Sequence, residues 1–138
     1  MGERRKAREF ALQFLYQSDI DKDKENIENS FNILRKYLEV KEEIGNFSWL
    51  LVKGVSDNKE TIDSYIQTHS DNWSIKRMPV IDRNILRIAV FELYHCEDIP
   101  KRVSMNEAIE LGKRFGTEKS SAFINGILDK VAREVSKE

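Results

Sequence analysis

The sequence predicts an all-α protein made of two small helical bundles of about three helices each. Apolar residues recur with helical spacing along most of the chain, and no segment shows the sustained alternation that a half-buried strand requires. The chain of 138 residues contains only two prolines, Pro79 and Pro100, so long helices can form between them. A hydrophobic content of 40% is enough to build one compact core.

Three helices are expected in the N-terminal half. The first covers residues 4 to 17, where apolar residues follow four, seven and eight positions after Ala7. A charged stretch over residues 19 to 25 separates it from a second helix over residues 27 to 38. The third and longest covers residues 47 to 66.

Turn-forming residues between His69 and Pro79 predict a boundary between the two halves. We therefore expect an N-terminal subdomain, residues 1–72, that contains an arginine-rich first helix. A C-terminal subdomain, residues 73–138, follows it, and the two form one compact unit.

The C-terminal half is expected to contain three more helices. A strong apolar stripe predicts the first over residues 81 to 93. Ser104 and Glu107 have the spacing of a capping box, so the next helix should begin near Met105 and end before Gly116. Thr117 is the expected cap of the last helix. The apolar stripe of that helix consists of Ile124, Ile127, Leu128, Val131 and Val135.

Positive charge is concentrated at the N-terminus although the whole chain has a net charge of only -1. Arg4, Arg5, Lys6 and Arg8 give a local excess of +3 over the first eight residues. Because Arg4 and Arg8 lie one helical turn apart, we expect their guanidinium groups along one solvent-exposed face, where they could bind phosphates. The alternative is a solvated basic face with no ligand.

A second basic cluster lies between residues 101 and 119 and has an excess of +2. It includes Lys113 and Lys119, and Phe123 follows close to the start of the last helix. An aromatic ring at the border of the core, near cations, could stack an unpaired base. The alternative is an ordinary core residue.

No pattern in the sequence predicts an enzyme, a cofactor or a metal site. There is no glycine-rich phosphate loop and no nucleophile elbow. The consecutive residues His95, Cys96 and Glu97 would point about 100° apart on a helix and could not converge on one ion. His69 should have a surface or capping role. A single cysteine and the lack of a bilayer-spanning apolar run predict a cytoplasmic protein without a membrane segment.

Four blocks of the sequence resemble the NusB family. They are RRKAREFALQFLYQSD (Arg4 to Asp19), RMPVIDRNILRIAVFEL (Arg77 to Leu93), IPKRVSMNEAIELGKRFGTEKS (Ile99 to Ser120) and FINGILDKVARE (Phe123 to Glu134). The third and fourth blocks are the most specific, and the resemblance covers nearly the whole chain.

The resemblance implies a transcription antitermination factor that binds single-stranded boxA-type RNA with a NusE-type small-subunit ribosomal protein. It would act with RNA polymerase in an antitermination complex that supports ribosomal RNA transcription. Arg4, Arg5, Lys6 and Arg8 would correspond to the family's RNA-facing arginine-rich motif, and Phe123 to an aromatic residue near the RNA. Tyr16 and Asp82 would lie at the NusE interface. Lys6 and Lys119 depart from the family pattern, but both keep or add positive charge.

Three other functions are compatible with parts of the sequence. NusB-like domains also occur ahead of an RNA cytosine methyltransferase, but no strand-helix region able to bind a methyl donor follows in this chain. The chain could instead be a helical interaction protein, or a helix-turn-helix DNA reader. The sequence also leaves open a homodimer of the free protein that covers its own basic face.

Overall fold

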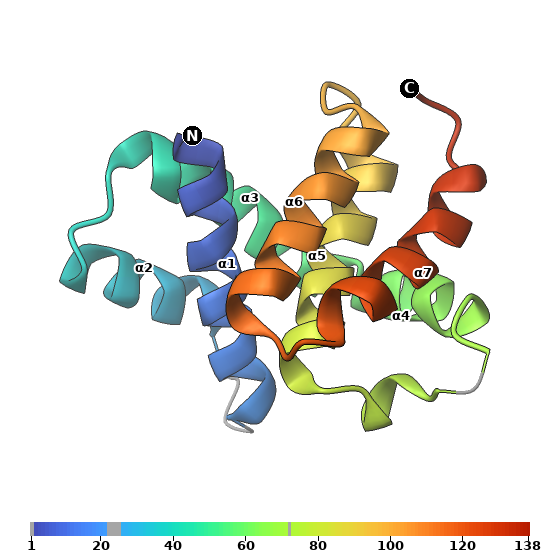
Figure 1. Ribbon diagram of the computed structural model, residues 1–138. Helices are drawn as coiled ribbons and strands as arrows, with labels where there is room; N and C mark the ends of the chain where they lie inside the picture. Colours follow the sequence, from blue (N-terminus) through green and yellow to red (C-terminus); the bar gives the residue numbers. More distant parts are fainter. Residues whose placement is uncertain (1, 22–25, 72) are drawn as a thin grey trace.

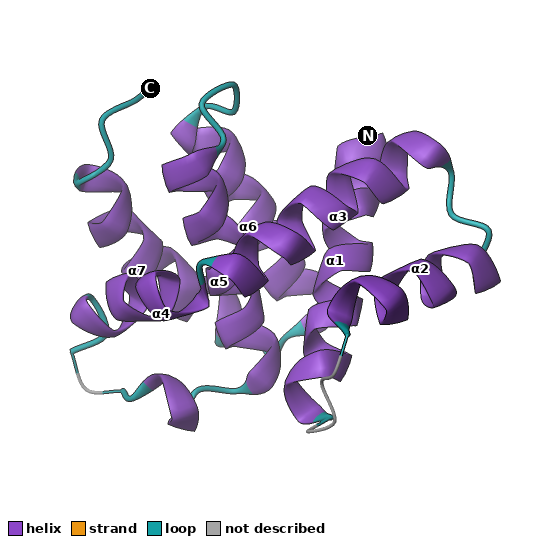
Figure 2. Ribbon diagram, turned by 180° about the vertical axis from the view of Figure 1, so that it is seen from behind, coloured by secondary structure: helices purple, strands orange, loops and turns teal. Residues whose placement is uncertain are grey.

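The computed structural model describes residues 2–21, 26–71 and 73–138, and these residues contain helices and loops but no strand. The all-α prediction is confirmed (Figures 1 and 2). Part of the charged stretch predicted after the first helix, residues 22–25, lies outside the described residues. In chain order the elements are α1 (Glu3–Ile20), α2 (Ile27–Tyr37), α3 (Glu42–Asp57), α4 (Lys59–Thr68), the 3₁₀ helix η1 (Ile75–Arg77), α5 (Val80–His95), α6 (Lys101–Phe115) and α7 (Ser120–Arg133).

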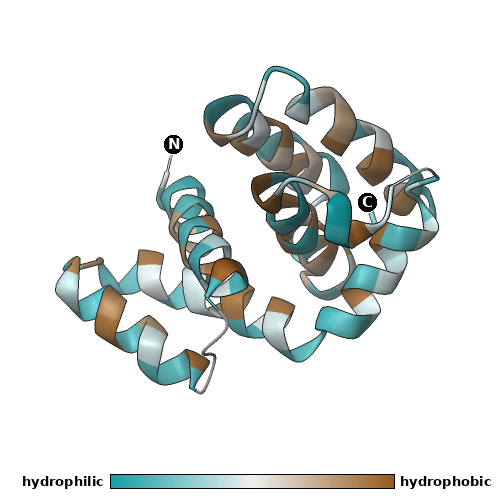
Figure 3. Ribbon diagram, turned by 90° about the horizontal axis from the view of Figure 1, so that it is seen from below, coloured by the Kyte–Doolittle hydropathy of each residue, from teal (hydrophilic) through white to brown (hydrophobic). Residues whose placement is uncertain are grey.

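Helix α5 is the centre of the fold. It packs against α1, α3, α4, α6 and α7, and every residue from Asn84 to Leu93 is buried. Hydrophobic and hydrophilic residues alternate around the surrounding helices, as one-sided packing requires (Figure 3). Because Arg87 and Glu92 lie inside this buried stretch, each needs a partner to offset the cost of its desolvation.

The predicted third helix is two helices, so the prediction of one helix over residues 47 to 66 was wrong. Helix α3 ends at Asp57, where both the backbone N–H and the side-chain amide of Asn58 donate to the Gly54 carbonyl, at 3.1 and 2.8 Å. Such a bond from a side chain to the backbone competes with helix propagation. Helix α4 then packs mainly against α5, so the core continues from one half of the chain into the other. The division at residue 72 stays a prediction.

Helix α6 begins one turn earlier than predicted, at Lys101, directly after Pro100. The expected capping box does not form, because Ser104 and Glu107 lie inside the helix and bond to other helices. Helix α6 ends at Phe115 as predicted, and a side chain at Gly116 would collide with Ser120. The predicted cap at Thr117 was also wrong: α7 begins at Ser120, whose hydroxyl accepts a hydrogen bond from the Thr117 N–H at 2.9 Å.

Two lysine side chains hold the C-terminal residues in place by hydrogen bonds to backbone carbonyls. Lys101 donates from Nζ to the carbonyls of Ala132 and Val135, at 2.9 and 3.0 Å. Lys137 donates to the carbonyls of Glu92 and Cys96, at 2.9 and 2.7 Å. These cations lie at the C-terminal ends of α7 and α5, where unpaired carbonyls carry partial negative charge. No helix in the described part of the chain is long and apolar enough to cross a membrane.

An ionic network joins α1, α4 and α5. One carboxylate oxygen of Asp19 accepts hydrogen bonds from Arg83 at 2.8 Å, Arg87 at 2.9 Å and Asn84 at 3.0 Å. Arg87 also binds both carboxylate oxygens of Asp63, at 2.8 and 3.1 Å. Burial would raise the pKa of Asp19, but the hydrogen bonds from Arg83 and Asn84 and the charges of both arginines hold it well below its ordinary value.

We predict that Asp19→Asn lowers the free energy of unfolding by about 3 kcal/mol at neutral pH, because two largely buried guanidinium groups lose a shared anion. The folded-state pKa of Asp19 is lowered, so its contribution is complete above its unfolded pKa of about 4 and is lost as the pH falls from there toward the folded-state pKa. Urea unfolding followed by circular dichroism at several pH values should show the difference between parent and variant shrinking below about pH 4.

The matched control is Asp57→Asn, which breaks an exposed pair with Lys53 one turn away. This change should cost less than about 0.5 kcal/mol. A parent and an Asp19→Asn protein with the same stability at neutral pH would contradict the role given to the network.

Candidate nucleic-acid interface

Helix α1 presents its basic residues in three different environments. Arg4 and Lys6 are exposed, Arg5 is half-buried, and Arg8 is only 3% exposed. Arg4 lies with its guanidinium carbon 4.4 Å from the centre of the Phe47 ring and makes a loose 3.5 Å pair with Asp98. Arg4 and Arg8, whose guanidinium groups were predicted to lie along one solvent-exposed face, therefore do not share it.

Arg8 points into the protein, so the prediction of a solvent-exposed Arg8 was wrong. Its position lies on the same helical stripe as the buried Leu12 and Leu15, and this stripe faces α5. The guanidinium group forms a two-pronged pair with Glu92, from Nε at 2.7 Å and from the second nitrogen at 2.9 Å. The Ser104 hydroxyl donates a third hydrogen bond to the same carboxylate at 2.7 Å. Arg8 thus joins α1 to α5 and, through Glu92, to α6.

Arg5 forms the next ion pair toward the surface. It donates to both oxygens of Glu107 on α6, at 3.1 and 2.8 Å. The hydrogen bond from Arg5 holds the pKa of Glu107 below its ordinary value, so this carboxylate is ionised at neutral pH. Arg5 remains half-exposed and is therefore accessible to a competing anion.

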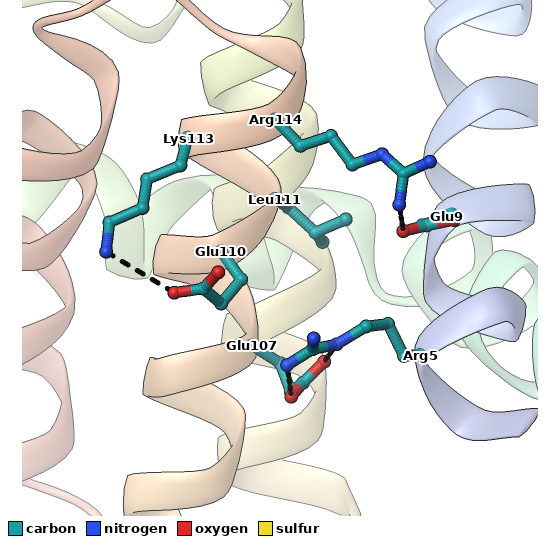
Figure 4. Close-up of a pocket in the computed structure, with 7 residues that line it drawn as sticks. All are labelled: Arg5, Glu9, Glu107, Glu110, Leu111, Lys113 and Arg114. Atoms are coloured by element: carbon teal, nitrogen blue, oxygen red, sulfur yellow. Dashed lines mark hydrogen bonds and ion pairs between the residues drawn. The ribbon is translucent and has the colours of Figure 1, made fainter. Parts of the chain in front are cut away.

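A shallow hollow lies between α1 and α6, and its rim carries three cations and three carboxylates (Figure 4). Besides the Arg5 pair, Arg114 binds Glu9 across the two helices at 2.7 Å. Lys113 binds Glu110 along α6 at 3.4 Å. Within this hollow every cation is neutralised by its own carboxylate.

Two of the predicted RNA-binding cations, Lys6 and Lys119, have no ion pair among the described residues. Lys6 is exposed on α1, and Lys119 is exposed at the residue before α7. Phe123 lies one turn after Lys119, is half-buried at the edge of the core, and contacts Trp73 edge-on. The structure therefore places Phe123 at the border of the core, as the sequence predicted, with an additional aromatic neighbour.

The two residues predicted to bind a protein partner lie in different environments. Tyr16 is 37% exposed and borders a hollow that Ile81 and Phe115 also line. Asp82 is buried and accepts a hydrogen bond from the Ser120 hydroxyl at 2.7 Å, so its side chain does not project outward as a residue at a protein interface would. The reason is that the first turn of α5 packs beneath the start of α7. Burial raises the pKa of Asp82, and the Ser120 bond offsets part of that rise.

Other polar residues have structural environments. His69 caps the end of α4, as predicted, by bonding the Tyr65 carbonyl at 2.8 Å and Glu134 at 3.0 Å. Cys96 is buried, and this burial raises the pKa of its thiol to about 11. No group of three potential metal ligands occurs in the described ranges.

Sequence reasoning did not identify the acidic partners of the basic residues. Glu92 carried a usable signal, because a single carboxylate inside a stretch of apolar residues must be paired if that stretch is buried. Glu9 and Glu107 carried none, since both lie in mixed, polar surroundings along the sequence. Their pairing depends on how α1 and α6 face each other.

Comparisons with known proteins agree with this fold. The model of the NusB family matches residues 5–133. Transcription antitermination protein NusB of Desulforapulum autotrophicum is 47% identical over 131 residues, which cover 95% of this chain and 92% of that protein. The protein of the same name from Geotalea daltonii is 49% identical over 138 residues, covering 96% and 95%.

Two solved structures are similar over almost the whole chain. The structure of T. maritima NusB has a TM-score of 0.85 and 36% identity, and the match covers 96% of this chain and 92% of that one. A complex of the antitermination factors NusB and NusE with double-stranded RNA matches with a TM-score of 0.84 and 28% identity, covering 95% and 96%.

We predict that Arg8→Met lowers the free energy of unfolding by about 3–5 kcal/mol, because the buried Glu92 carboxylate loses its counter-charge. Adding Glu92→Gln to this variant should recover part of the loss, since no buried charge then remains unpaired. Chemical unfolding of the single and double variants measures both effects.

Lys6→Met is the matched control on the same helix, where the side chain is exposed and lacks an ion pair within the described structure. It should change stability by less than about 0.5 kcal/mol. If Arg8→Met unfolded at the same denaturant concentration as Lys6→Met, the Arg8–Glu92 pair would not hold α1 in place.

Proposed function

The chain belongs to the NusB family of transcription antitermination proteins, and from this premise we propose that it binds single-stranded boxA-type RNA together with a NusE-type ribosomal protein. In this proposal the complex joins the RNA polymerase antitermination complex and supports ribosomal RNA transcription. The protein is not an enzyme. The observation that carries the proposal is the arrangement of cations on α1 and α6, part paired with carboxylates and part exposed.

Arg4 and Lys6 would make the first phosphate contacts. Both side chains are exposed on α1, and neither is held by a short ion pair. A phosphate can bind them without displacing a strong internal partner. Two cations alone give modest affinity, which fits a protein whose net charge is only -1.

Arg5 and Lys113 would bind phosphate only after the phosphate displaces the carboxylate with which each is paired. In the free protein each is paired with a carboxylate of α6, Glu107 or Glu110. RNA must compete with these internal anions, so a weakly fitting RNA gains little from the contact. This competition favours one well-fitting RNA element over nucleic acid in general.

Lys119 and Phe123 would extend the RNA site to the start of α7. Lys119 provides a charge at the residue before the helix, and Phe123 provides an aromatic edge. A base that leaves the RNA stack could pack there, which favours single-stranded over double-stranded RNA.

Arg8 would support this site from inside the protein, without contacting the RNA. Because its guanidinium group is buried and holds Glu92, it is not available to a phosphate in this structure. Its place in the basic motif is best explained as the anchor that sets the position of Arg4, Arg5 and Lys6.

The hollow beside Tyr16 is the proposed docking place of the NusE-type protein. Tyr16 and Phe115 expose 37% and 42% of their surface there, next to the half-buried Ile81. Asp82, next to Ile81, would contribute by holding the start of α7 through Ser120.

The experiment that tests this function is a titration of labelled boxA-like RNA with the protein, alone and with the NusE-type partner. We expect weak binding alone and much tighter binding with the partner. The same RNA as a duplex should bind less tightly. Equal affinity for an RNA of unrelated sequence, with and without the partner, would instead indicate a helical interaction protein with a basic edge.

We predict that Arg4→Ala combined with Lys6→Ala weakens RNA binding without changing the melting temperature. Each lost phosphate contact should reduce the slope of log affinity against log salt by about 0.7, so the double variant should lose about 1.4. Fluorescence anisotropy at several salt concentrations measures this slope.

The control is Lys36→Ala combined with Lys41→Ala. These two cations are exposed near the end of α2 and have no ion pair in the described residues. Removing them changes the net charge by the same amount as removing Arg4 and Lys6. If both double variants shifted the slope equally, general charge would explain the binding, and the site on α1 would be refuted.

We also predict that Glu107→Gln strengthens RNA binding, because Arg5 is then released for phosphate. A gain of roughly two- to fivefold is expected, equivalent to the worth of one partly exposed ion pair. The salt slope should become steeper by about 0.7. Glu60→Gln, an exposed change on α4 with the same effect on net charge, should leave both quantities unchanged. Weaker binding by Glu107→Gln would contradict the competition.

A further inference from the structure

Two aromatic residues from distant parts of the chain meet beside the start of α7. Trp73 lies in the loop before η1, and Phe123 lies in the first turn of α7. Their ring centres are 6.0 Å apart and their planes are inclined at 73°, so one ring meets the other edge-on. Phe123 packs against the core, whereas 49% of Trp73 is exposed.

The exposed Trp73 is held in place by its backbone. Gln67 of α4 donates from its side-chain amide to the Trp73 carbonyl at 2.8 Å, and its amide oxygen accepts from the Ile75 N–H at 2.9 Å. Trp49 provides a contrast, because its ring packs on Phe31 at 5.1 Å and is half-buried. These bonds fix the backbone at Trp73 and Ile75, while about half of the Trp73 surface stays exposed to solvent.

The charged residues closest in sequence to these two rings are mostly basic and have no ion pair among the described residues. Lys76, Arg77 and Lys119 are exposed, and none forms an ion pair with another described residue. The nearest acidic residues along the two segments are Glu118 and Asp71, and Asp71 is already paired with Lys130 at 3.0 Å. Exposed aromatic faces beside free cations suit a ligand that carries both flat rings and phosphates.

We propose that Trp73 and Phe123 together form a stacking site for an unpaired RNA base, with Lys76, Arg77 and Lys119 binding the adjoining phosphates. This proposal rests on the proposed function and adds Trp73 and η1 to the RNA-binding surface. Because the two rings already touch edge-on, a base cannot enter between them. It stacks on the outer face of Trp73, while Phe123 supports the indole from the side of the core.

The fluorescence of Trp73 can report whether a base is bound at the site, because the chain has only one other tryptophan. In a Trp49→Phe background, Trp73 is the single source of tryptophan fluorescence. We expect single-stranded boxA-like RNA, added with the NusE-type partner present, to quench this fluorescence in step with binding measured by anisotropy. Addition of the partner alone should not quench it.

Substitutions then separate stacking from packing. Trp73→Leu keeps an apolar side chain but loses the aromatic face, and should weaken RNA binding roughly 5- to 150-fold, the range expected for one stacked base. Trp73→Phe should restore most of the affinity. Tyr37→Leu is the matched control, since Tyr37 is 81% exposed at the end of α2, on the other side of the molecule from α7 (Figure 1).

The possible outcomes are distinct. Unchanged Trp73 fluorescence at saturating RNA, together with full affinity of Trp73→Leu, would overturn the stacking site while the proposed function stands. Quenching by the partner protein alone would also overturn it, because Trp73 would then belong to a protein interface. If the parent protein bound no RNA with or without the partner, the proposed function would fail first. A lower melting temperature for Trp73→Leu, with RNA affinity intact, would assign Trp73 to packing.

Discussion

The buried ion pair between Arg8 and Glu92 is the interaction on which the basic surface depends. A carboxylate in the interior is tolerated only when its oxygens are bonded, and here Arg8 and Ser104 supply three hydrogen bonds. These bonds come from α1 and α6, so one charge on α5 orients both helices that line the hollow. A hydrophobic pair could hold the helices together equally well, but it would not fix their register so specifically.

The same register decides which cations are free. With α1 and α6 held in this orientation, Arg5 and Arg114 reach carboxylates on the opposite helix, while Lys6 does not. The surface therefore offers a few unpaired cations next to several cations whose carboxylate partners an external anion could displace. A protein with balanced composition can in this way recognise an anion locally without attracting every polyanion through its overall charge.

The fold was largely predictable from the sequence, but the site was so only in part. Apolar periodicity located the helices around α5 because burial on one face leaves a regular pattern. It did not reveal the break at Asn58, which depends on one amide bonding the backbone. Basic residues were visible as a cluster, whereas the burial of Arg8 and Asp82 was not, since a charged residue on a packed face looks the same in sequence as one in water. Only the tertiary pairing separates them.

The pairing of Arg8 with Glu92 also has a consequence for the order of synthesis, because these residues are separated by 84 positions in the chain. The basic helix leaves the ribosome well before Glu92 and Glu107. During that interval the nascent N-terminus carries its cations without their internal anions, close to ribosomal RNA. Once α5 and α6 have formed, Glu92 and Glu107 neutralise Arg8 and Arg5, so these two cations lack a counter-charge only while the chain is incomplete.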